Sequence, residues 1–196
     1  MTQFLARRSP FLLGAGALAV LVLAIVLLTV PGGDGGDGRD GGDGKPRPRA
    51  ALPPLPRAFA NPAMRIAGRL PRGWSAVGGR QVVHLRNRDG SAVIVIAAPR
   101  TQATSGALLA EALRATRKTY RRVKVNVVRG ASLAGLPAKS RAVYTRNARG
   151  VPIRILLVGI RGRRHGYVLE AFTRQRAPAR ALVESQQILG TLRFAG

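Results

Sequence analysis

Two clusters of basic residues are the part of this sequence whose residue types and spacing most clearly indicate a chemical function. One lies between residues 117 and 124, and the other between residues 161 and 164. Guanidinium and ammonium groups are cationic at neutral pH, and they donate hydrogen bonds to phosphate and carboxylate oxygens. The sequence therefore predicts binding of an anionic surface, with Arg117, Lys118, Arg121, Arg122, Lys124, Arg161, Arg163 and Arg164 as the candidate residues.

The charge of the whole chain supports this hypothesis and also supplies an alternative to it. The chain holds 33 Lys+Arg against 8 Asp+Glu, for a net charge of +25. Such a balance attracts phospholipid headgroups, acidic polymers or nucleic acid. However, cations near a helix C-terminus also interact favourably with the helix dipole, which gives the first cluster a structural reason. Arginine can equally form a solvated face, so incidental charge remains an open alternative.

The acidic residues of the C-terminal part do not form a recognisable catalytic set. Glu111 and Glu184 are expected at solvent-facing helix positions, and Asp89 in a turn where Asp bonds its own backbone. Glu170 lies in an apolar strand, where an ion pair with a neighbouring arginine is favoured over catalysis. General acid–base catalysis needs positioned titratable groups, and these spacings provide none.

Metal and nucleophile motifs are also missing from the sequence. His84 and His165 have no ligand at metal-binding spacing, and no serine sits in a Gly-x-Ser-x-Gly elbow. The glycines near residues 159–166 lack the lysine and helix of a phosphate loop. The sequence therefore predicts that the protein binds no metal, binds no cofactor and is not an enzyme. Trp74, after Gly73, is expected to close one end of the core, with ligand stacking as the less favoured role.

Strands and helices that would position the basic clusters can be located from hydrophobic periodicity. Alternating or continuous apolar runs predict strands, and apolar residues at helical spacing predict two helices. Hairpin signals lie at residues 87–90 and 147–150. The predicted order is strands 64–70, 81–86 and 91–97, helix 104–120, strands 123–127, 138–146, 151–160 and 167–173, helix 178–189, and strand 191–194. This order predicts an α+β fold in which an antiparallel sheet is flanked by two helices.

An uncharged apolar run, residues 11–30, predicts one transmembrane helix before this domain. A helix of this length spans about 30 Å, the thickness of a bilayer's hydrocarbon core. Arg7 and Arg8 lie close before it, so residues 1–10 are expected in the cytoplasm and the C-terminal domain outside. A cleaved signal peptide is the alternative, although the run exceeds the usual apolar length of about 7–15 residues.

Residues 31–62 are predicted to be a linker between the span and the domain, which then covers residues 63–196. The first part, PGGDGGDGRDGGDG, has no apolar residue that could build a core. The second part is rich in proline and is expected to be stiffer and extended. Together they would hold the domain away from the membrane.

Three short motifs of the domain resemble those of the PsbP-like superfamily. Leu70-Pro-Arg-Gly-Trp74 looks like its LPxGW opening, and Gly135-Leu-Pro-Ala138 is similar to its GxPA step. The end of the chain, residues 188–194, resembles its last helix running into a final strand. The resemblance spans about residues 63–195. It implies an α/β/α sandwich and a binding or accessory role, and it brings no catalytic motif.

These observations together predict a single-pass cell-membrane protein with a non-catalytic, basic binding or accessory domain outside the cytoplasm. Its partners would be the membrane, an anionic lipid or envelope polymer, or a protein, and the predicted topology ranks nucleic acid last. An accessory or structural subunit of a membrane complex, with incidental charge, is the alternative. A cavity that gathers Glu170 with a histidine would favour an enzyme instead.

Overall fold

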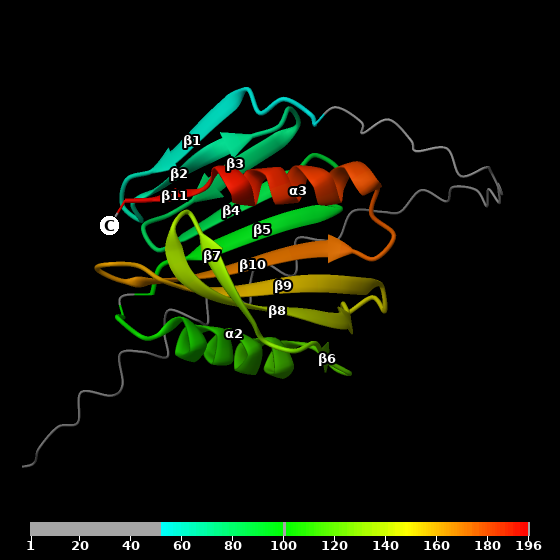
Figure 1. Ribbon diagram of the computed structural model, residues 1–196. Coiled ribbons are helices and arrows are strands. Elements are labelled where there is room, and N and C mark those ends of the chain that lie inside the picture. The colour runs from blue at the N-terminus through cyan, green and yellow to red at the C-terminus, as the bar shows by residue number, and fades with distance from the viewer. Residues whose placement is uncertain (1–51, 100, 196) are drawn as a thin grey trace, which may run out of the picture.

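The computed structural model describes residues 52–99 and 101–195. An antiparallel sheet of eight strands runs through the centre of this part of the chain (Figure 1). Its strands follow the order β3 (Trp74–Gly78), β4 (Val82–Asn87), β5 (Ala92–Ala97), β10 (Gly166–Arg174), β9 (Pro152–Arg161), β8 (Leu136–Arg146) and β6 (Lys124–Val125), and β7 (Arg129–Leu133) pairs with β8. β9 is an internal strand, as its apolar residues on both faces predict.

Two helices cover opposite faces of the sheet. α2 (Ser105–Thr119) packs on β8, β9 and β10, and α3 (Ala179–Thr191) packs on β2, β5 and β10. Side chains of β10 alternate between the two cores: Val168 and Phe172 lie on the α2 side, and Leu169 lies on the α3 side. The predicted α+β class with two helices flanking an antiparallel sheet is therefore confirmed.

A second, three-stranded sheet lies beside α3. It consists of β1 (Arg57–Asn61), β2 (Ile66–Leu70) and β11 (Arg193–Phe194), in the order β1-β2-β11. β11 confirms the predicted closing strand, whereas β1 corrects the predicted linker, which included residues 57–61. No apolar alternation identifies β1 in the sequence, because it is an exposed edge strand held by pairing with β2.

The segment before β8 differs from the prediction of one strand over residues 123–127. Only Lys124–Val125 pairs with β8, and Val127 is 79% exposed. The chain then pairs again with the first half of β8 as β7, through a two-residue hairpin loop at Ala134 and Gly135. Both loop residues have positive φ, 52° and 77°, as this tight turn requires. Residues 126–128 are therefore a connection between two short strands.

The two ends of the central sheet differ in what they carry. The Trp74 end holds Trp74, Asn87, the last turn of α2 and the first turn of α3. The His165 end holds the β9–β10 turn and the first turn of α2, whose Ser105 lies beside Gly159. The helices thus run in opposite directions. The C-terminus of α2 and the N-terminus of α3 lie at the Trp74 end, and the other two termini lie at the His165 end.

Within residues 52–99 and 101–195, no helix is long and apolar enough to cross a membrane. The predicted span, residues 11–30, lies outside the described residues, as do residues 1–10 and most of the predicted linker.

Candidate functional site

The structure places the two predicted basic clusters at opposite ends of the sheet. The first lies at the Trp74 end, where Thr145 Oγ1 donates to the carbonyl of Arg121 at 2.9 Å and Lys124 pairs with Tyr144. The second lies in the β9–β10 turn at the His165 end. α2 separates them, and its 15 residues extend about 22 Å. The two clusters are therefore separate surfaces.

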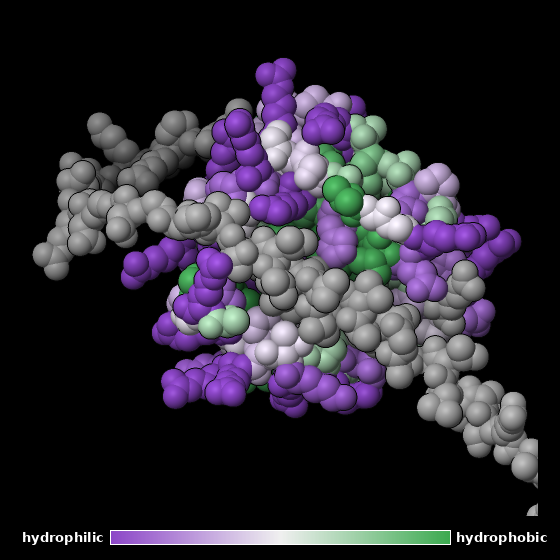
Figure 2. All heavy atoms as spheres, turned by 180° about the vertical axis from the view of Figure 1, so that it is seen from behind, coloured by the Kyte–Doolittle hydropathy of each residue, from purple (hydrophilic) through white to green (hydrophobic). Residues whose placement is uncertain are grey.

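All eight predicted side chains are exposed. None of them forms an ion pair with an acid in the part of the chain that the structure describes. From behind, hydrophilic residues form much of the outline of the molecule, and hydrophobic residues lie nearer the middle of that face (Figure 2). The first cluster is joined at its end of the sheet by Arg146 and Arg149 of the β8–β9 hairpin, which the sequence prediction missed. The hairpin signal at residues 147–150 could have indicated that these arginines project at a sheet end.

Exposed valines lie beside the first cluster. Val127 is 79% and Val128 is 40% exposed in the connection that follows Lys124, and Val151 is 38% exposed beside Arg149. These side chains adjoin unpaired cations and fill no core position. A surface of this kind can contact both the headgroups and the apolar boundary of a lipid layer.

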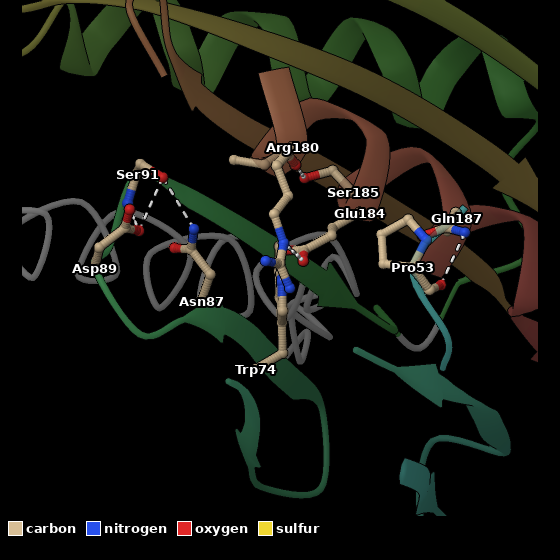
Figure 3. Close-up of polar contacts among 10 residues, drawn as sticks. Pro53, Trp74, Asn87, Asp89, Ser91, Arg180, Glu184, Ser185 and Gln187 are labelled. Carbon is tan, nitrogen blue, oxygen red and sulfur yellow. Dashed lines mark hydrogen bonds and ion pairs between the residues drawn. The ribbon is translucent and has the colours of Figure 1, made fainter. Parts of the chain in front are cut away.

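Trp74 and Glu184 meet in the core beneath the Trp74 end (Figure 3). Trp74 is 1% exposed, which confirms its predicted place at the end of the core. Its Nε1 donates to Glu184 Oε2 at 2.8 Å, and Arg180 Nε donates to Glu184 Oε1 at 2.7 Å. The prediction that Glu184 faces solvent is wrong, since it is 5% exposed. One oxygen of Glu184 accepts a hydrogen bond from a guanidinium group and the other accepts one from an indole N–H. These two hydrogen bonds explain how a carboxylate is buried here.

A cavity of about 520 Å³ lies over this pair of residues. Its walls come from three segments distant in sequence, and they consist of Arg72, Gly73, Trp74, Asn87, Arg88, Asp89, Pro178, Arg180, Ala181 and Glu184. Asp89 Oδ1 accepts from Ser91 N at 2.9 Å and from Ser91 Oγ at 2.8 Å. Burial favours the protonated form of Asp89, but hydrogen bonds from Ser91 and the charge of Arg174 outweigh it and hold its pKa below the ordinary value.

Among the described residues, Glu170 does not have the predicted arginine partner. It is 4% exposed on the α2 face, between Val95 and Leu157 on the neighbouring strands, and no described residue forms an ion pair with it. Burial raises the pKa of Glu170 to about 8. Its carboxyl group is therefore largely protonated at neutral pH.

Among the described residues, no cavity gathers Glu170 with a histidine, the arrangement that would favour an enzyme. His84 lies in the same row of the sheet, but Val95 stands between the two residues. The cavity that includes His165 is lined otherwise by Ala63, Arg80, Gln81 and Ala98, and it does not reach Glu170. Over the described ranges, no three His, Cys, Asp or Glu residues gather as metal ligands.

Comparison with known proteins identifies the fold. No protein-family model and no curated protein sequence matches this chain. Its structure is similar to that of cyanobacterial PsbP (CyanoP) from Synechocystis sp. PCC 6803, with a TM-score of 0.53 and 10% identity over 78% of this chain and 98% of that one. A protein from Bacteroides thetaiotaomicron VPI-5482 gives a TM-score of 0.51 and 12% identity, over 71% of this chain and only 48% of its own length.

LpqN of Mycobacterium tuberculosis, described as involved in cell envelope biogenesis, is more distant, with a TM-score of 0.47 and 13% identity over 65% of this chain and 81% of LpqN. The domain has the PsbP-like fold, as the sequence motifs predict. Identities this low establish the fold alone, and function has to be argued from the surfaces of this chain.

Proposed function

We propose that this protein is a non-catalytic binding module that residues 11–30 hold at a membrane, with its basic domain against an anionic surface of the cell envelope. The observation that carries the proposal is the first cluster, in which five exposed cations have no acidic partner in the described chain. Arg146, Arg149 and the exposed valines extend it. Each cation near an anionic lipid surface contributes about 1 kcal/mol, screened by salt.

Binding to lipid vesicles tests the proposed surface. The tested piece should begin at residue 52, because β1 starts at Arg57 and Gln187 Nε2 donates to the carbonyl of Pro53. We expect it to bind phosphatidylglycerol vesicles at low salt and phosphatidylcholine vesicles little. Glutamine at all five positions of the first cluster should weaken the anionic binding at least about tenfold in co-sedimentation, since several cations are lost together.

The second cluster provides the matched comparison. Arg161→Gln, Arg163→Gln and Arg164→Gln remove three exposed charges at the opposite end of the sheet. This variant should lose less affinity than Arg117→Gln with Arg121→Gln and Arg122→Gln, which removes the same charge, if the first cluster makes the contact. Equal, salt-independent binding to both kinds of vesicle contradicts the electrostatic proposal. A fixed protein partner that stays bound in high salt would instead support the accessory-subunit alternative.

Membrane topology is the second testable part of the proposal. Reporter fusions after Gly44 and at the C-terminus should both report an extracytoplasmic position, because Arg7 and Arg8 favour the cytoplasm for the N-terminus. A cytoplasmic reading from both fusions would overturn the proposed orientation. It would also bring the basic domain into contact with nucleic acid.

A further inference from the structure

The cavity at the Trp74 end lies apart from the basic surface proposed above, is open to solvent and has the size of a small-molecule site. Its volume of about 520 Å³ falls within the range of small-molecule pockets, about 300–1,000 Å³. It is bounded by the residues before β3, the β4–β5 turn and the first turn of α3. We propose that this cavity binds a small organic anion, through a carboxylate or phosphate group held by Arg72, Arg88 and Arg180.

The two arginines at the β3–β4 side of the cavity have no partner among the described residues. Arg72 and Arg88 are exposed, and neither forms a hydrogen bond or ion pair within the described part of the chain. The pairing of Trp74 with Asn87 brings their segments together, and a Cβ on Gly73 would lie 4.0 Å from Arg88 Cβ. A carboxylate or phosphate group at this rim would therefore meet guanidinium groups that form no ion pair with another described residue.

Among the described residues, no ion pair joins Arg72 or Arg88 to the acids in the cavity wall. Glu184 already accepts from Trp74 and from Arg180, and Asp89 accepts twice from Ser91 (Figure 3). Arg180 gives only its Nε to Glu184, and its side chain is 70% exposed. The terminal nitrogens of Arg180 form no ion pair with another described residue, and Arg180 lines the α3 side of the cavity.

The start of α3 adds a further preference for negative charge. Pro178, at the N-cap, forms no side-chain cap, and the first turn contains no acidic residue. The positive end of the helix dipole is therefore uncompensated beside Arg180. The indole of Trp74 is 1% exposed, so the ligand would be held by its charge and not by stacking on this ring. Guanidinium groups bind carboxylate and phosphate by the same paired hydrogen bonds, so both are candidates.

Tryptophan fluorescence of the full chain tests this site directly, because Trp74 is the single tryptophan of the sequence. The chain, in a neutral detergent at constant ionic strength, is titrated with citrate, with glycerol 3-phosphate and with uncharged glycerol. We expect a saturable change with at least one anion, at a Kd below about 1 mM, and none with glycerol. Binding of citrate alone would indicate a preference for carboxylate, and binding of glycerol 3-phosphate alone would indicate a preference for phosphate.

Substitutions at the rim provide the decisive comparison. Arg72→Gln with Arg88→Gln should weaken binding about tenfold or more, because both free guanidinium groups are lost. Arg161→Gln with Arg163→Gln removes the same charge at the other end of the sheet and should leave the affinity unchanged. Calorimetry is run alongside, since the bound anion need not perturb the indole.

Two results would overturn the inference. One is the absence of saturable binding at 10 mM of either anion by both methods. The other is an equal loss of affinity in the two double variants, which would indicate general attraction to a basic protein. Either result leaves the vesicle-binding proposal intact, because that proposal depends on the first cluster and not on the cavity arginines.

Discussion

Replacing Glu170 with glutamine is expected to stabilise the protein by about 2–3 kcal/mol at pH 7 and to change its stability little at pH 4. Glu170 is 4% exposed, lies in the apolar face beneath α2, and has no ion-pair partner among the described residues. Burial without a counter-charge disfavours the carboxylate, so its pKa rises from 4.5 to about 8. Glutamine has nearly the same shape and carries no charge to bury.

The direction of the pH dependence follows from proton uptake. Between about pH 4.5 and pH 8 the folded state holds a proton on Glu170 that the unfolded state has released. The free energy of unfolding therefore falls as pH rises through this range, and the contribution is constant below it, where both states are protonated. In the variant this fall should be absent.

Urea unfolding at pH 4, 6, 7 and 8 measures the difference. Glu111→Gln is the matched control, because Glu111 lies on the surface of α2 in an ion pair with Arg114, and its removal should change the stability by less than about 1 kcal/mol. Parallel pH curves for the wild type and Glu170→Gln would mean that Glu170 is ionised and compensated in the folded state. That result would restore the arginine pairing predicted from the sequence.

Gly159→Ala is expected to destabilise the protein by about 2–3 kcal/mol, because it would force α2 away from the sheet. A Cβ on Gly159 would overlap the carbonyl oxygen of Ser105 and come within 2.8 Å of Leu109 N. Both are backbone atoms of α2, so a side-chain rotation cannot relieve the overlap. The helix would have to shift and lose its packing on β9.

Gly130→Ala gives the matched control. Gly130 is also a strand glycine, in β7, but nothing lies within 4 Å of its added Cβ. Alanine there should change the free energy of unfolding by less than about 0.5 kcal/mol. Equal effects of the two substitutions in urea unfolding would contradict the close approach of α2 to β9.

Elements with strong local patterns could be predicted from the sequence, and weakly patterned elements could not. The apolar runs that became β4, β5, β9 and β10 bury side chains on both faces, and both helices present an apolar stripe. β1 and β7 are largely exposed, so their residues lack the alternation that identifies a strand. Their strand conformation comes from pairing with β2 and β8, which the sequence does not reveal.

The candidate sites divide in the same way. The two basic clusters could be recognised from the sequence, because their members are basic residues that lie close together along the chain. The cavity could not be predicted, because Trp74 and Glu184 are 110 residues apart and meet only through the packing of α3 on the sheet. Helical periodicity alone predicted that Glu184 faces solvent, because periodicity within one helix does not show a buried hydrogen-bond donor on another element.

The sequence by itself determined the apolar run, the excess of positive charge, most strands and both helices, because composition and periodicity act over a few neighbouring residues. Only the tertiary structure decided that the two basic clusters lie at opposite ends of α2 and that three arginines line one cavity. It also decided that Glu170 is buried without an ion pair to any described arginine. These facts depend on strand order and on the directions of the two helices. They are set by contacts between distant segments, for which no local pattern exists.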